Sequence, residues 1–178
     1  PAVSGIGICV PGIANQADGT VWAPNIGGWD FFPLIRYLQE KLSRDLSVTI
    51  DSDRACSILA ETWLGAARGA KDALFVAVGT GIGLGILANG QILRGFGDIA
   101  GATGWMALRP DFFPGYQHFG CFEYHASGDG LARVARDKLQ ENPESVSLLS
   151  SILPEKLRAE DVFTAYSTGD PIATDVLE

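Results

Sequence analysis

The chain has 178 residues, of which 47% are hydrophobic and 19% charged, a composition typical of one globular domain or two small ones. No stretch holds the roughly 18 consecutive apolar residues that a membrane span requires. Lys and Arg number 13 and Asp and Glu 21, for a net charge of −8. This argues against direct nucleic-acid binding, which needs a basic surface.

The cysteines point to a reducing compartment. Cys9, Cys56 and Cys121 are odd in number, far apart, and surrounded by apolar or small residues. This favours buried free thiols over a disulfide framework, so we expect a cytoplasmic protein. The sequence opens inside a strand-like run, Val3–Val10, and we therefore expect it to be a fragment.

The first third of the chain alternates strands and helices. Val3–Val10 predicts a strand buried on both faces, and Asp18–Gly19 a tight hairpin turn into Val21–Trp22. Asp30 is expected to cap a helix with Pro33 in its first turn. The apolar positions of that helix are Phe31, Leu34, Ile35, Leu38 and Leu42.

A strand is predicted at Leu46–Asp51, and Ser52–Asp53 lead from it into a helix from about Arg54 to Ala67. Its apolar face comprises Ile58, Leu59, Trp63 and Ala66. Strands are expected next at Ala73–Val78 and Ile82–Leu87, followed by a turn at Asn89–Gly90 into Gln91–Arg94. Gly95–Gly120 is expected to be a long loop. Helices are expected at Glu123–Gln140 (broken at Gly128), Ala159–Thr168 and Pro171–Glu178. The fold class is α/β, without the strict alternation of a doubly wound sheet.

The segment Gly79–Gly85 carries four glycines between two predicted strands. It lacks the spacing and following helix of a dinucleotide-binding loop, and the lysine of a P-loop. Two interpretations remain. The glycines allow backbone amides, with the Thr80 hydroxyl, to approach phosphate oxygens, or they form a crowded hairpin without a ligand.

Several ordered segments together resemble the ROK family of bacterial sugar kinases and sugar-responsive repressors. They are Gly7–Gly12, Ala23–Trp29, Asp51–Asp53, Glu61–Gly69, Val78–Ile86 and Gly120–Gly128, with a weaker match from Glu160 to Pro171. The resemblance implies an actin-like ATPase (ribonuclease H-like) fold of the two-domain sugar kinase type. It also implies transfer of a phosphoryl group from ATP, with Mg²⁺, to a hexose or amino sugar, and a homodimer.

The family's upstream Asp-x-Gly-Gly-Thr phosphate motif and downstream adenosine-binding segment do not occur within residues 1–178. We therefore expect the fold to be incomplete in this chain. Residues 1–68 would form the second half of the small N-terminal domain, and residues 69–178 the first part of the large C-terminal domain. Such a chain should not hold ATP well alone.

The resemblance assigns roles to particular residues. Asp53 matches the catalytic aspartate, which would accept the proton of the attacking sugar hydroxyl. From its position alone, a cap of the following helix is the favoured interpretation of this residue. The positions matching the ATP phosphate contacts are Gly79, Thr80, Gly81 and Gly83. The expected sugar contacts are Gly12, Asn25, Ser52, Asp53, Trp105 and Glu123. Glu123 could instead be a first-turn carboxylate favoured by the helix dipole.

The sugar pocket departs from the family pattern. Ser52 replaces the usual Asn before the catalytic Asp, and Ala102–Trp105 replaces Glu-x-Gly-His, so a carboxylate and an imidazole are lost. Trp105 could stack on an apolar sugar face or fill the vacated volume. Because a pocket built on hydrogen bonds discriminates strongly, these losses predict an altered substrate or weaker activity.

The family's zinc site is also degenerate. Pro114 and Tyr116 occupy two of its cysteine positions and only Cys121 remains, whereas a structural zinc needs about four ligands. His118 and His125 are expected to be ordinary surface or half-buried histidines. We predict no zinc.

Two alternatives to a kinase remain from the sequence. One is a sugar-responsive ROK regulator or a catalytically degenerate kinase-like binding protein. Family regulators carry a helix-turn-helix ahead of the kinase-like part, so the upstream sequence would separate them from kinases. The other is a glycine-rich α/β domain unrelated to this family.

Overall fold

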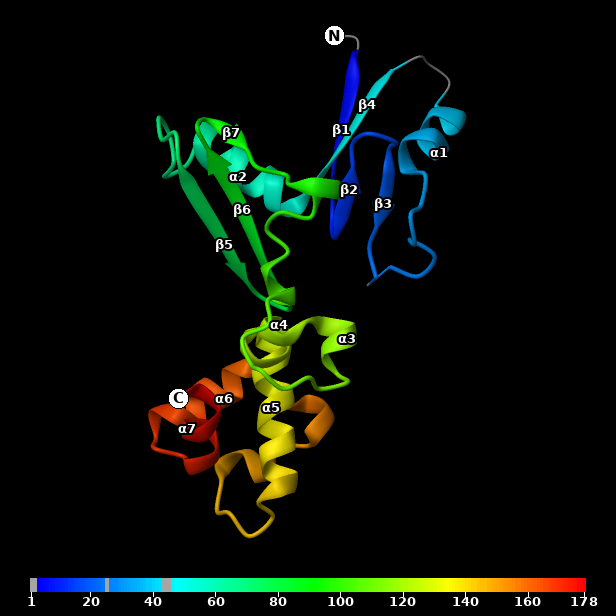
Figure 1. Ribbon diagram of the computed structural model, residues 1–178. Coiled ribbons are helices and arrows are strands. Elements are labelled where there is room, and N and C mark those ends of the chain that lie inside the picture. Colours follow the sequence, from blue (N-terminus) through cyan, green and yellow to red (C-terminus); the bar gives the residue numbers. More distant parts are fainter. Residues whose placement is uncertain (1–2, 25, 43–45) are drawn as a thin grey trace. The chain divides into compact units, whose positions relative to one another are not determined.

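The computed structural model describes residues 3–24, 26–42 and 46–178. The chain divides into two compact units, coloured along the sequence in Figure 1. Unit 1 comprises Pro1–Val76 and Leu84–Gly101, and unit 2 comprises Ala77–Gly83 and Ala102–Glu178. The expected division of the complete protein between residues 68 and 69 stays a prediction.

Unit 1 begins with two small sheets. Strand β1 (Gly5–Val10) pairs in parallel with β4 (Ser47–Ser52), in a register that places Cys9 beside Asp51. Strands β2 (Ile13–Asn15) and β3 (Thr20–Trp22) form the predicted hairpin, and Oδ1 of Asp18 accepts hydrogen bonds from the amide and hydroxyl of Thr20.

The core of this part lies on one side of the parallel strands, next to helix α1 (Leu34–Lys41) (Figure 1). Its buried members are Val10, Ala14, Val21, Ala23, Leu34 and Ile50. The prediction that β1 is buried on both faces was wrong within unit 1. Exposure alternates along the strand, because this core covers one face and leaves Gly7 and Cys9 exposed.

Helix α1 begins later than expected, and Asp30 does not cap it. Phe32 exchanges two backbone hydrogen bonds with Val21, of 2.9 Å each, so this residue extends the hairpin instead. Pro33 also disfavours helical backbone at the residue before it. Phe31, expected on the apolar face, has a φ of 51° and a side chain that is 65% exposed.

Helix α2 (Asp53–Trp63) follows β4 without a linker. It ends four residues before the predicted Ala67, where Oε2 of Glu61 accepts a hydrogen bond from the Ala66 amide in a non-helical turn. Of the predicted apolar face, Ile58 is buried, whereas Leu59 and Trp63 are exposed.

A three-stranded sheet follows in the order β5 (Ala73–Val78), β6 (Ile82–Ala88) and β7 (Gln91–Ile92). Asn89 and Gly90 both have positive φ, as the predicted tight hairpin turn requires. A short 3₁₀ helix, η1 (Phe96–Asp98), comes next.

Unit 2 is helical apart from the strand ends around residue 80. Its elements are η2 (Thr103–Trp105), α3 (Tyr116–Phe119), α4 (Cys121–Ala126), α5 (Gly128–Glu141), η3 (Leu148–Ser151), η4 (Pro154–Lys156), α6 (Ala159–Ser167) and α7 (Pro171–Leu177). Helices α5, α6 and α7 enclose its apolar core, which centres on Ala135, Leu149 and Val162 (Figure 1). The predicted break at Gly128 is confirmed, because Ser127 caps a new helix there.

Across residues 3–24, 26–42 and 46–178, no helix has the length and apolar character needed to cross a membrane.

Candidate functional site

The junction of β4 and α2 positions the predicted catalytic residue. Oγ of Ser52 accepts a hydrogen bond from the Ala55 amide at 3.2 Å, so Ser52 is the N-cap of α2. Asp53 is the first helical residue and its side chain is exposed. Its Oδ1 accepts from the adjacent Arg54 amide at 2.8 Å. The capping role that the sequence left open for Asp53 therefore belongs to Ser52.

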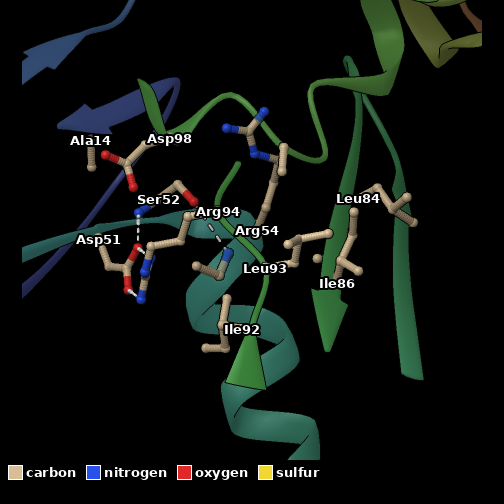
Figure 2. Close-up of a pocket in the computed structure, with 13 residues that line it drawn as sticks. Ala14, Asp51, Ser52, Arg54, Leu84, Ile86, Ile92, Leu93, Arg94 and Asp98 are labelled. Carbon is tan, nitrogen blue, oxygen red and sulfur yellow. Dashed lines mark hydrogen bonds and ion pairs between the residues drawn. The ribbon is translucent and has the colours of Figure 1, made fainter. Parts of the chain in front are cut away.

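An ion pair between Arg94 and Asp51 lies at the β4 side of the junction between β4 and α2. Asp51 accepts two hydrogen bonds from the Arg94 guanidinium, at 2.5 and 2.7 Å, and its Oδ1 also accepts from the Ser52 amide at 2.9 Å. Both side chains are partly buried, and Figure 2 shows Arg94 lying against Asp51 at one wall of a small cavity in unit 1. The pair therefore links the end of β4 to the segment after β7.

Arg54 connects the start of α2 to the turn after β1. Its Nη2 donates to the carbonyl oxygen of Gly12 at 3.2 Å. Burial lowers the pKa of the Arg54 guanidinium, and the neighbouring Asp53 carboxylate opposes that shift. Gly12 itself has a φ of +84°, and a Cβ there would lie 2.2 Å from the Trp22 carbonyl oxygen. Glycine is thus required at this turn for backbone reasons, independently of any sugar contact.

The cysteines of unit 1 lie beside this junction. Burial raises the pKa of the Cys56 thiol to about 12, with further contributions from Cys9 and the carboxylates of Asp51 and Asp53. A thiol with so high a pKa stays protonated at neutral pH and is a poor nucleophile. Cys121 is buried as expected and Cys56 partly so, whereas Cys9 is exposed, which corrects the prediction of three buried thiols.

The predicted phosphate-binding segment forms a turn between β5 and β6. We call residues 79–83 the glycine turn. The Gly79 amide donates to the Gly81 carbonyl oxygen at 2.9 Å, and both Gly79 and Thr80 are exposed. A Cβ built on Gly79 would meet no atom within 4 Å, so packing within the chain does not require glycine there. The predicted contacts of this turn with ATP stay predictions.

Gly85, at the end of the same glycine-rich segment, has a different reason to be glycine. A Cβ there would lie 2.4 Å from the Arg54 carbonyl oxygen and 2.9 Å from Cβ of Ile58, both on α2. The crowded-packing interpretation of the sequence thus applies to this glycine, which lets α2 approach β6 closely.

The other predicted sugar-contacting residues are divided between the units. Unit 1 carries Gly12, Ser52 and Asp53, and unit 2 carries Trp105 and Glu123. Glu123 lies in the first turn of α4, where its Oε2 accepts a hydrogen bond from the Ile82 amide at 2.8 Å. Trp105 is 46% exposed, so unit 2 does not enclose its ring. Asn25 lies outside the described residues.

Aromatic residues occupy the region that matches the family's zinc motif. The Tyr116 hydroxyl lies 2.8 Å from Nε2 of His125, and the rings of Phe113, Tyr116 and Tyr124 meet edge to face. Burial lowers the pKa of His125, and Arg109 and Arg133 lower it further. A single thiol, Cys121, beside a neutral phenol does not fit a structural zinc. The prediction that the protein holds no zinc stays a prediction.

Sequence reasoning missed several residues that position this site. Asp51, Arg54 and Arg94 were not selected, because the ion pair and the bond to Gly12 join residues 42 or 43 apart. In the sequence, Gly104 stands out only within Ala102–Trp105, the segment that replaces the family's Glu-x-Gly-His. In the structure, a Cβ on Gly104 would lie 2.8 Å from Oε2 of Glu123. One signal was available for Asp51, which stands two residues before Asp53 at the end of a predicted strand.

The ROK family model matches residues 1–178, the whole chain. A glucokinase from Halalkalibacterium halodurans is 38% identical over 177 residues, which cover 98% of this chain and 53% of that protein. A ROK family glucokinase from Streptomyces griseus, solved in complex with glucose and AMPPNP, has a TM-score of 0.74 at 29% identity, over 98% of this chain and 57% of that one.

A ROK family transcriptional regulator, a homologue of the E. coli MLC protein, has a TM-score of 0.75 at 24% identity, over 98% of this chain and 43% of its own. At that identity the likeness shows the fold alone. The chain spans about half the length of the curated relatives it matches. The full-length family match and the 38% identical relative lead to one conclusion: this α/β chain, with the actin-like ATPase fold, belongs to the ROK family.

Proposed function

We propose that the complete protein is an ATP-dependent sugar kinase, acting on a hexose or amino sugar through an altered pocket. The observation that carries the proposal is the exposed Asp53 carboxylate at the first position of α2, with Ser52 serving as the cap. Because Ser52 caps the helix, the Asp53 carboxylate is available to accept the proton of a sugar hydroxyl. The similarity to glucokinases supports the same activity.

In this proposal each part of the site has a separate task. Asp53 accepts the proton of the attacking hydroxyl and orients its oxygen toward the γ-phosphate of ATP. The glycine turn, with the Thr80 hydroxyl, faces the phosphates, since preorganised amides stabilise developing negative charge. Glu123 and the residues around Gly12 contact the sugar, and Mg²⁺ accompanies ATP.

The test is a coupled ADP-release assay of the complete protein with glucose, mannose, N-acetylglucosamine and N-acetylmannosamine. We expect turnover on at least one sugar and a fall in kcat of about 10²- to 10⁴-fold in Asp53→Asn, the usual contribution of a general base. Asp129→Asn is the matched control, because Asp129 is also exposed in a first helical turn behind a serine cap.

Asp129→Asn should retain the wild-type kcat. Turnover that is unchanged in Asp53→Asn would refute the role of Asp53, and no turnover on any sugar would refute the kinase. A regulator shares the fold, and it would bind a sugar without releasing ADP.

A further inference from the structure

A carboxylate from α4 holds the start of β6. Glu123 Oε2 accepts a hydrogen bond from the Ile82 amide at 2.8 Å, although the two residues are 41 positions apart. Ile82 is the first residue of β6 and directly follows Gly81 in the glycine turn. A bond from an amide to an ionised carboxylate is roughly twice as strong as one between neutral groups, so this contact can fix the backbone locally.

Two glycine backbones enclose the same carboxylate. A Cβ on Gly81 would lie 2.7 Å from Oε2 of Glu123, and one on Gly104 would lie 2.8 Å from that oxygen. Neither glycine has positive φ, so the absence of a side chain, rather than unusual backbone, explains their identity. Any larger residue at either position would push the carboxylate away from Ile82.

The glycine turn has a second attachment, to α5. The Gly128 amide donates to the Gly79 carbonyl oxygen at 2.7 Å. Gly128 is the first residue of α5, directly after the cap Ser127. The turn is therefore held at one end by a side chain of α4 and at the other by the backbone of α5.

Arg133 fixes α4 against α5, so the two attachments share one support. Its Nη1 donates to the Tyr124 carbonyl oxygen at 3.2 Å. The guanidinium lies 4.0 Å from the centroid of the Phe119 ring and 4.7 Å from that of Tyr124. Arg133 therefore joins the two helices to which the glycine turn is attached.

We propose that Glu123 is a positioning residue for the glycine turn, and that it couples sugar binding to nucleotide binding. One carboxylate oxygen, Oε2, holds the Ile82 amide, while Oε1 serves the sugar. Sugar binding then stabilises the turn that receives the phosphates, and ATP binding favours the sugar-binding position of Glu123 by the same factor. The sugar contact and the phosphate contact rest on the proposed kinase function.

The kinetic test compares Glu123→Ala with Glu123→Gln in the complete protein. Alanine removes the acceptor for Ile82, so the KM for ATP should rise by about tenfold, the loss typical of a charge-assisted hydrogen bond. Glutamine keeps an oxygen that can accept from the same amide, so its KM for ATP should stay within about threefold of wild type. The KM for the sugar should rise in both.

Glu160→Ala is the matched control, because Glu160 is an exposed carboxylate in the first turn of another unit 2 helix, α6. Its KM values should equal those of the wild type. A KM for ATP in Glu123→Ala that stays at the wild-type value, or that rises no more than in Glu123→Gln, would overturn the positioning role.

Gly104→Ala tests the enclosure while leaving Glu123 intact. The added methyl group should displace the carboxylate and raise the KM values for both ATP and the sugar. Gly7→Ala is the control, since the nearest atom to a Cβ there is Oγ1 of Thr49 at an ordinary 3.8 Å. A rise in the KM for the sugar alone in Gly104→Ala would contradict the coupling.

Hydrogen–deuterium exchange separates this inference from the kinase proposal. The exchange rate of a peptide spanning residues 79–85 is measured without sugar or ATP, in wild type, Glu123→Ala and Glu160→Ala. We expect faster exchange in Glu123→Ala alone. This result would support the positioning of the glycine turn by Glu123 even in a protein that transfers no phosphate. Unchanged exchange would overturn that positioning role even in an active kinase.

Discussion

At the scale of single residues, Ser52 and Asp53 show how neighbours divide two tasks. Both residue types are good helix caps, so the sequence alone allowed either to cap α2. In the structure Ser52 accepts from the Ala55 amide and Asp53 occupies the first turn. The first turn of a helix is a position that favours an acidic residue, which suits the place of Asp53.

Ser52→Ala tests this division. We expect a loss of about 1 kcal/mol in the free energy of unfolding, because one helix N–H loses its acceptor. The kcat should also fall, since Asp53 is the next residue along the chain. Urea unfolding and the coupled assay measure the two effects.

Ser52→Thr is the control, because threonine keeps the hydroxyl acceptor. It should recover most of the stability. Wild-type stability in Ser52→Ala would mean that the bond to Ala55 contributes nothing to α2.

Single residues also show where sequence reasoning stops. Asp53 and the glycine turn could be selected from motifs in an ordered series. The Arg94–Asp51 pair and the bond from Ile82 to Glu123 could not, because each joins segments about 40 residues apart that only the folded chain brings together. The family resemblance assigned Glu123 to the sugar, but nothing in the sequence indicated its contact with Ile82.

At the scale of elements, the strands and the helices of the C-terminal part of the chain were predicted well, whereas the ends of helices α1 and α2 were predicted poorly. The strand ranges and the Asn89–Gly90 turn followed directly from apolar runs and turn residues. The start of α1 was missed because Phe32 pairs with Val21, a tertiary contact that overrides the capping signal of Asp30. The apolar pattern of α2 also predicted more burial than unit 1 provides for Leu59 and Trp63.

Asp170 shows that a cap can join elements as well as begin one. Its carboxylate accepts from the Ile172 and Ala173 amides at the start of α7, and from Ser147 and Leu148 at the start of η3. Burial by itself would raise the pKa of this carboxyl. The hydrogen bonds from Ala173, Leu148, Ser147 and Ile172 outweigh burial and lower the pKa below its usual value.

The lowered pKa predicts a pH dependence of stability. A carboxyl group with a lower pKa in the folded state stabilises the fold above its unfolded pKa of about 3.9. That stabilisation is lost as the pH falls through the folded pKa. We expect Asp170→Asn to be less stable than wild type at pH 7, with a difference that shrinks below about pH 4.

Urea unfolding at pH 7 and pH 2.5 measures this difference. Asp129→Asn, an exposed substitution of the same kind, should show no comparable loss at either pH. A difference between Asp170→Asn and wild type that stays constant from pH 7 to pH 2.5 would contradict the role assigned to the ionised carboxylate.

At the scale of the whole molecule, the chain forms two compact units that carry different parts of the proposed site. Unit 1 holds Asp53 on a junction braced by Asp51 and Arg94, and unit 2 holds the glycine turn and Glu123. The sequence predicted the α/β class and the family, because both depend on an ordered series of segments. The bracing within each unit became visible only in three dimensions.

The most direct test of the kinase proposal is product analysis of the complete protein by ³¹P NMR, with ATP and the sugars named above. We predict a sugar-phosphate resonance that grows as the γ-phosphate of ATP disappears. In Asp53→Asn its rate of appearance should fall by about 10²-fold or more, and in Asp129→Asn it should be unchanged. Inorganic phosphate or no product from the wild-type protein, or an undiminished sugar-phosphate signal in Asp53→Asn, would contradict the account.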